Sequence, residues 1–169
     1  AADLGLSAIA ITDHNSLAGV VRAYAALKEL RRSMNEITIR STKRVDPSSR
    51  EEIQGQDITL HGDHLPKLII GARLILEDSD VDWVALPRDR KAYEALSRLL
   101  TLGKRRSEKG SCQLYYADVL EGAQGMILIA LPRTLEQEAS AHIRQMARRY
   151  PGHVYLGAAP RYDGSDQEY

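Results

Sequence analysis

The chain has 169 residues, enough for one domain with a sizeable core and too few for two comfortable ones. Lys and Arg together number 23, as do Asp and Glu, so net charge gives no argument for attraction to nucleic acid or to a membrane. The single cysteine, Cys112, excludes an internal disulfide and is typical of a reducing cytoplasm, and no apolar run approaches the length of a membrane span. We therefore expect one cytoplasmic globular domain over residues 1–169, without a membrane partner.

Apolar runs of strand length alternate with longer segments of helical period, which predicts a β/α architecture. The predicted strands cover residues 8–11, 67–70, 84–86, 126–131 and 154–157. Four helices are predicted. The first begins near Ser16, the second runs from Asp89 towards Lys104, the third covers 116–121, and the fourth runs from Thr134 to the Pro151-Gly152 pair.

Residues 31–66 do not fit this alternation. The segment is polar, contains a Pro-Ser-Ser turn, and is much longer than an ordinary connection between a helix and a strand. We expect an inserted, mobile excursion in which residues 36–40 (EITIR) and 57–61 (DITLH) pair as a small hairpin.

Asp13 and His14 stand at the end of the first predicted strand, immediately before a helix. In β/α folds, ligands bind beyond the carboxyl ends of strands. A carboxylate beside an imidazole suits zinc, manganese or iron, and a helix beginning at Ser16 would favour phosphate. The alternative is that Asp13 caps the helix and His14 is a hydrogen-bonded turn residue.

The other candidate ligands have weaker patterns. His61 and His64 flank Asp63 in a short metal-like motif, but they lie in the polar excursion without further ligands nearby. We expect His142 to be a surface residue of its helix. Cys112 lies in a loop near several basic side chains that would lower its pKa, but no partner base is apparent.

A basic segment follows the second predicted helix. Its cations suit a phosphate backbone or another protein domain. The alternative is a solvated helix end, where cations are favoured by the helix dipole. The residues concerned are Lys104, Arg105, Arg106 and Lys109.

Four segments, taken in order, resemble a known family. They read LGLSAIAITDHNSLAGVVRAYAALKE, LPKLIIGARLILED, WVALPRDRKAYEALSRLLTLGKRRSEKG and YYADVLEGAQGMILIALP. Together they resemble the PHP (polymerase and histidinol phosphatase) domain of bacterial C-family DNA polymerases. The stretch LSRLLTLGKRRSEKG is particularly similar to the error-prone branch of DNA polymerase III alpha subunits.

The resemblance implies an α/β fold, a distorted (βα)7 barrel of the PHP type. Here we expect it to be incomplete: the first strand, with its His-x-His motif, would precede Ala1, and the C-terminal part would follow Tyr169. Because Ala1 opens the chain inside a predicted helix without an initiator Met, we expect a piece of a longer protein.

The resemblance also marks vestigial positions of a metal site. His14 falls on a family metal ligand, with Asp13 beside it, and Arg73 stands where the family has the Glu of a Gly-Ala-Glu motif. Close to Asp82, the family has a histidine at the start of the strand. An arginine stays protonated and cannot bind a metal, so we predict that Arg73 forms an ion pair with Asp13 in place of the metal. No residue of this chain is then expected to be catalytic.

The function implied is a structural scaffold within an error-prone DNA polymerase that carries out translesion synthesis and DNA repair. Its partners would be the rest of the polymerase chain, DNA through that polymerase, and other repair proteins. No cofactor is expected in this chain, and magnesium is expected for the parent polymerase.

Two alternatives stay open. One is a stand-alone phosphoesterase of the histidinol-phosphatase type, which would require manganese, zinc or iron. The other is a remnant without function, which would fold poorly because an incomplete barrel leaves open sheet edges.

Overall fold

The computed structural model describes residues 4–42, 65–134 and 137–158. Two compact units divide the chain. One comprises Ala1–Ile9 and Val20–Ile69, and the other comprises Ala10–Gly19 and Ile70–Tyr169. The second unit contains most of the sheet and every residue of the candidate site discussed below.

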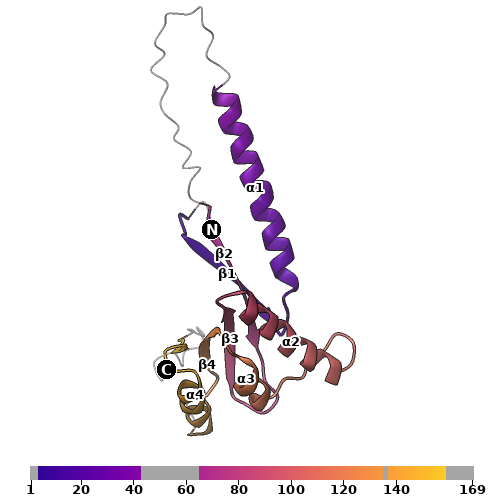
Figure 1. Ribbon diagram of the computed structural model, residues 1–169, viewed down its shortest axis with the longest axis vertical. Coiled ribbons are helices and arrows are strands. Elements are labelled where there is room, and N and C mark those ends of the chain that lie inside the picture. Colours follow the sequence, from indigo (N-terminus) through magenta and orange to yellow (C-terminus); the bar gives the residue numbers. More distant parts are fainter. Residues whose placement is uncertain (1–3, 43–64, 135–136, 159–169) are drawn as a thin grey trace, which may run out of the picture. The chain divides into compact units, whose positions relative to one another are not determined.

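The first unit contains nearly all of helix α1 (Ala18–Thr42) (Figure 1). The expected hairpin is wrong in its first half, because residues 36–40 are helical. Strong helix formers such as Ala, Leu, Lys and Arg precede them, and an established helix propagates at little cost through the β-branched Ile37 and Ile39. Residues 43–64, which include the second half of that hairpin, lie outside the described residues.

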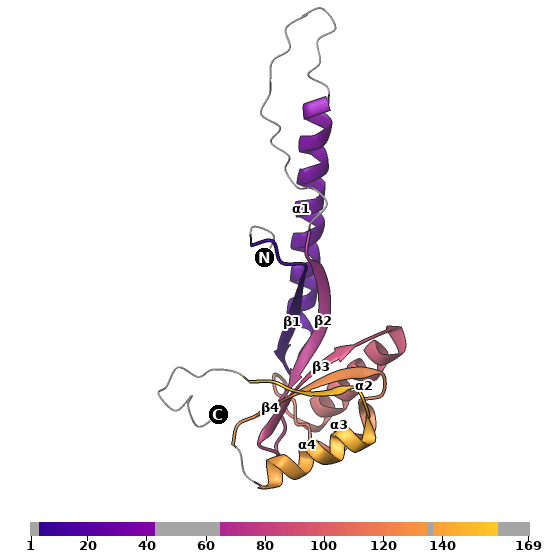
Figure 2. The same ribbon diagram turned by 90° about the vertical axis from the view of Figure 1, so that its left-hand side faces the viewer.

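Five strands form one sheet in the order β1-β2-β3-β4-β5 (Figure 2). They are β1 (Ala8–His14), β2 (Lys67–Leu74), β3 (Val81–Pro87), β4 (Met126–Pro132) and β5 (Val154–Leu156). All five predicted strands are present, and β1 to β4 extend beyond the predicted bounds.

The sheet is mixed. β2 and β3 are antiparallel, with Ala72 opposite Ala85, and so are β3 and β4, with Trp83 opposite Ala130. β4 and β5 are parallel, because helix α4 (Gln137–Arg149) lies between them in sequence and returns the chain in the same direction. The α/β class is therefore confirmed.

Helices α2 (Arg90–Arg106) and α3 (Tyr116–Gly122) complete the predicted set. Asp89 begins α2 as predicted: its carboxylate accepts a hydrogen bond from Ala92 N at 2.8 Å. The last turn of α2 holds Lys104, Arg105 and Arg106, where cations are favoured by the helix dipole.

One face of the sheet forms the core with the helices. Along β4, buried residues alternate with partly exposed ones. Leu74, Trp83 and Leu128 are fully buried on the core face, in one cluster with Leu96 of α2 and Met146 of α4. The opposite face carries the ion pair of Arg73 and Asp82 and several apolar side chains that are only partly buried: Val84, Ile127, Ile129 and Leu131.

Candidate functional site

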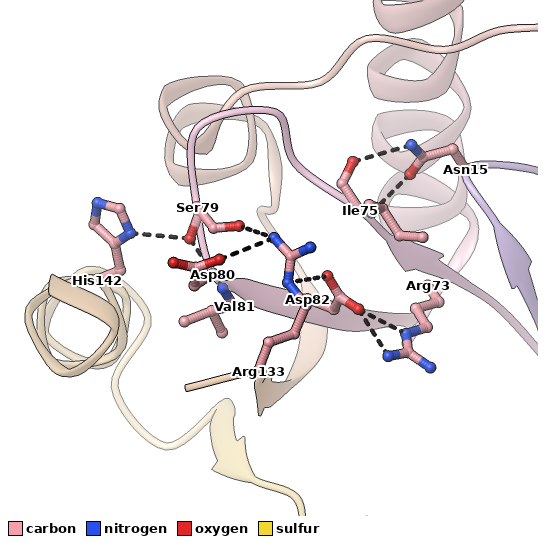
Figure 3. A network of polar contacts seen from close by, with 9 residues as sticks. All are labelled: Asn15, Arg73, Ile75, Ser79, Asp80, Val81, Asp82, Arg133 and His142. Atoms are coloured by element: carbon pink, nitrogen blue, oxygen red, sulfur yellow. Dashed lines mark hydrogen bonds and ion pairs between the residues drawn. The ribbon is translucent and has the colours of Figure 1, made fainter. Parts of the chain in front are cut away.

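Asn15 joins the ends of β1 and β2 within the second unit. Its backbone N donates to Arg73 O at 2.9 Å, and its side chain both accepts from Ile75 N at 2.9 Å and donates to Ile75 O at 3.0 Å (Figure 3). The Asn15 amide also donates to Cys112 O at 3.3 Å. The residue has a positive φ of 46°, which asparagine tolerates better than most residues. Sequence reasoning missed this role, although an Asn at a strand-to-helix junction is a signal for it.

Asp13 is a helix cap. Its Oδ2 accepts a hydrogen bond from Gly19 N at 2.6 Å, in the first turn of α1. A Cβ atom at Gly19 would lie 2.5 Å from the same oxygen, so a larger residue there would force the Asp13 carboxylate to shift away from its hydrogen bond. The geometry favours the capping alternative for Asp13, whereas the exposed His14 lies beside it at the end of β1.

Arg73 pairs with Asp82 instead of Asp13. Arg73 Nη2 and Nε donate to Asp82 Oδ2 at 2.7 and 3.1 Å (Figure 3). The predicted Arg73–Asp13 ion pair is therefore wrong. Arg73 lies opposite Val84 in the β2–β3 ladder, which puts it on the same face as Asp82, two residues away. Asp82 is only 3% exposed, and a buried carboxylate requires a counter-charge.

A second arginine approaches Asp82 from the end of β4. Arg133 Nε lies 3.8 Å from Asp82 Oδ1, and Arg133 Nη2 lies 3.4 Å from Asp80 Oδ1. Arg133 Nη2 also donates to the backbone oxygen of Ser79 at 2.6 Å. Two arginines thus flank one buried carboxylate at this end of the sheet.

His142 is not the surface residue we expected. Its Nδ1 lies 3.0 Å from Ser79 Oγ, and its ring stacks on Tyr116 with centroids 3.9 Å apart. The Tyr116 hydroxyl donates to His142 O at 2.9 Å, and burial raises the pKa of Tyr116 to about 12. These contacts attach α4 to α3 and to the turn before β3.

The basic segment divides between two cavities. Lys104 and Lys109 line a cavity of about 610 Å³ together with His14. Arg105 and Arg106 line another, of about 1020 Å³, between α2 and α3. Arg106 makes two hydrogen bonds to Asp118, which raise its pKa. The four cations therefore do not form one surface.

Cys112 lies in the same cavity as Lys104. The expected lowering of its pKa is wrong: burial raises the pKa of the thiol, and this effect outweighs the opposing effect of Lys104. The thiol also donates to Leu100 O at 3.7 Å. These features indicate a neutral thiol and not an activated nucleophile.

The family model for the PHP domain matches residues 1–159. This chain belongs to the PHP domain family. The error-prone DNA polymerase of Ruegeria pomeroyi is 64% identical over 170 residues, which cover 99% of this chain and 15% of that protein. The error-prone DNA polymerase of Rhodopseudomonas palustris is 37% identical, over 99% of this chain and 12% of that protein.

The chain thus spans 12–15% of the length of these relatives. A third, the error-prone DNA polymerase of Bradyrhizobium diazoefficiens, is 38% identical over 97% of this chain. In the part of the PHP domain that the structure describes, no helix is long and apolar enough to cross a membrane.

The described residues of this PHP domain do not fit a metal centre. Among them, no three His, Cys, Asp or Glu side chains gather in a way that could hold a metal ion. Asp13 already accepts a hydrogen bond from Gly19 N. Arg73 places a permanent positive charge near the ends of the strands, which repels a metal ion. His61 and His64, with Asp63, lie outside the described residues.

Proposed function

We propose that this chain is the PHP domain of an error-prone DNA polymerase and acts there as a structural scaffold with a degenerate metal site. The observation that carries the proposal is the match to the Ruegeria pomeroyi error-prone DNA polymerase, which extends over 99% of the chain at 64% identity. The parent would catalyse DNA-directed DNA synthesis in translesion repair with magnesium. Its catalytic carboxylates would lie outside this chain. It would act in the cytoplasm, together with DNA and other repair proteins.

The ion pair between Arg73 and Asp82 supports the degenerate metal site. A guanidinium cannot bind a cation, and it adds repulsion where a metal cluster needs negative charge. Arg73 also neutralises Asp82, which removes a carboxylate from the potential ligands at this end of the sheet. Asp13, His14 and Arg73 are thus proposed as vestigial positions with a structural role.

Within the α/β class, we propose that the fold is an incomplete barrel of the PHP type. Apart from Asp82, β3 and β4 are apolar on both faces, as is typical of strands buried between two layers. The helices cover one face, whereas Val84, Ile129 and Leu131 on the other are partly exposed. Further strands or helices of the parent polymerase would cover that second face and close the barrel.

The test compares two single substitutions in the full polymerase chain that carries this domain. His14→Ala removes the remaining family metal ligand, and we expect unchanged primer extension on undamaged and lesion-containing templates. Asp82→Ala removes the ion pair, and we expect a lower melting temperature with normal primer extension per folded molecule. Loss of DNA synthesis in His14→Ala at unchanged melting temperature would overturn the scaffold role. Absence of polymerase activity in the full chain would overturn the assignment itself.

A further inference from the structure

The cavity between α2 and α3 is a groove within the second unit, and its volume is about 1020 Å³. Ala95, Leu99 and Leu102 line it from α2 at positions i, i+4 and i+7, so they lie on one face of that helix. Leu99 is buried, whereas Leu102 is 40% exposed. The groove therefore offers an apolar stripe that is only partly covered.

Charged side chains line the groove beside this apolar stripe. Three of them are arginines and three are carboxylates, so their formal charges sum to zero. They are Arg98, Arg105, Arg106, Glu94, Asp118 and Glu121. A neutral groove does not attract a polyanion such as DNA, nor a strongly acidic or strongly basic protein.

Four of these six charges form ion pairs within the groove. The other two are Arg105 of α2 and Glu121 of α3, and both residues are exposed. Neither of these two side chains makes a hydrogen bond or an ion pair within the part of the chain that the structure describes. Each wall of the groove therefore carries one unpaired charge, positive on α2 and negative on α3.

A surface with one unpaired charge of each sign is complementary to a second copy of itself. Around a twofold axis, residue i of one copy contacts residue j of the other, and j contacts i. Arg105 of each copy can then pair with Glu121 of the other, which matches all four unpaired charges at once. Leu102 lies three residues before Arg105, on the same side of α2, and supplies apolar contact beside each ion pair. A purely acidic or purely basic partner would match only one of the two charges.

We propose that the groove between α2 and α3 is a homodimer interface, occupied by a second copy of this chain. Two reciprocal ion pairs, each between Arg105 of one copy and Glu121 of the other, fix how the copies are oriented. The proposal rests on the groove and its charges. It does not depend on the assignment to an error-prone DNA polymerase, so either can fail while the other stands.

Sedimentation velocity of the full chain that carries this domain measures the association. We expect a monomer–dimer equilibrium that shifts towards monomer at high salt, because ion pairs at a surface are screened. Arg105→Glu and Glu121→Arg should each weaken the dimer about 50-fold, because symmetry replaces two ion pairs by two like-charge contacts. Lys91→Glu is the matched control, since it makes the same change of charge at an exposed position of α2 that does not line the groove. Its association should equal that of the wild type.

A mixture of the two single variants provides the decisive comparison. A copy with Arg105→Glu carries two negative charges at the interface, and a copy with Glu121→Arg carries two positive charges. An equimolar mixture should therefore form a heterodimer with both ion pairs present. The double variant with both substitutions should form a homodimer again. Because both positions are exposed, we expect the melting temperatures of all these variants to equal that of the wild type.

Three results would overturn the proposal. The first is a full chain whose mass does not change between nanomolar and high micromolar concentration. The second is a dimer that survives both single substitutions, because its interface would then lie elsewhere. The third is loss of the dimer in each single variant without recovery in their mixture, because the reciprocal pairing would then be disproved.

Discussion

Arg73 and Asp82 form a salt bridge of 2.7 Å between neighbouring strands of the sheet, with the side chain of Asp82 only 4% exposed and that of Arg73 36% exposed. The arginine occupies a position where the family resemblance implies a metal-binding carboxylate. Each charge therefore has a counter-charge within the protein, and the ion pair joins β2 to β3 at this end of the sheet, although Asp82 Oδ1 is buried without a hydrogen-bond partner among the described residues.

Removal of the arginine and removal of the aspartate of this ion pair should lower the free energy of unfolding by unequal amounts. Arg73→Met leaves a buried carboxylate with only the more distant Arg133, and we expect a loss of about 3 kcal/mol in the free energy of unfolding. Asp82→Asn leaves an arginine that can still reach water, and we expect a loss of about 1 kcal/mol. Urea denaturation of each variant measures both values.

A surface pair provides the control for these substitutions. Arg98 and Glu94 are also 2.7 Å apart, but their side chains are 72% and 63% exposed. Arg98→Met should cost less than about 0.5 kcal/mol, because an exposed pair is screened by water. Equal losses in Arg98→Met and Arg73→Met would show that burial of Asp82 does not determine the energy of its ion pair.

Asn15 should be a stability determinant of the junction between β1 and β2. Asn15→Gly removes three side-chain hydrogen bonds but adopts the same positive φ without strain, so we expect a loss of about 2 kcal/mol. Asn15→Ala should lose about 1 kcal/mol more, because alanine is strained at that φ. Thermal denaturation of both variants tests the order, and an alanine variant more stable than the glycine variant would contradict it.

Gly103 should resist substitution although it lies inside a helix. A Cβ atom there would lie 2.7 Å from Cys112 Sγ and 2.9 Å from Leu114 Cδ2. We therefore expect Gly103→Ala to destabilise the fold by about 1–3 kcal/mol, against the usual gain from replacing a helical glycine.

Gly122 is the matched control, because its Cβ atom would meet only Leu99 Cδ1, at an ordinary 3.5 Å. Gly122→Ala should be neutral or stabilising in the same denaturation experiment. If both glycine variants gained stability, the close packing of α2 against the 112–114 segment would be disproved.

Stability should decline at high pH through Tyr116. Burial raises its pKa to about 12, whereas an unfolded tyrosine ionises near its ordinary pKa of 10.0. The folded state therefore keeps a proton that the unfolded state releases. Its contribution to stability is complete below pH 10 and is lost as the pH rises towards 12.

The measurement is the urea midpoint between pH 9 and pH 11. Tyr116→Phe should flatten the decline, whereas replacing the exposed Tyr155 by Phe should leave it unchanged. Burial also raises the pKa of Tyr150, so some decline will remain in Tyr116→Phe. An identical decline in wild type and Tyr116→Phe would contradict the effect of burial on Tyr116.

The sequence was sufficient to locate all five strands of the sheet and the first residue of four of them, β1, β2, β4 and β5, but not where the strands end. The apolar runs of β3 and β4 and the cap at Asp89 are local signals, and each was found where expected. The apolar pattern ends the first predicted strand too early, because Thr12, Asp13 and His14 are polar. In the structure these three residues continue β1. The prediction ended helix α1 before residue 31, because the β-branched residues near the end of the helix favour strands.

The arrangement of the site could not be predicted in the same way. Whether Arg73 meets Asp13 or Asp82 depends on the register between β2 and β3, and no local pattern fixes that register. The division of the basic segment has a similar cause. Lys104 and Arg105 are adjacent in sequence but line different cavities, because successive helical positions point in different directions.

The most direct test of the proposed degenerate metal site is the metal content of the full chain that carries this domain. The protein is incubated with manganese, zinc and iron, passed through a desalting column, and analysed by mass spectrometry of the elements. We predict equal background content in the wild type and in His14→Ala. One or more equivalents of metal in the wild type, lost in His14→Ala, would show that the ion pair between Arg73 and Asp82 has not replaced the metal centre.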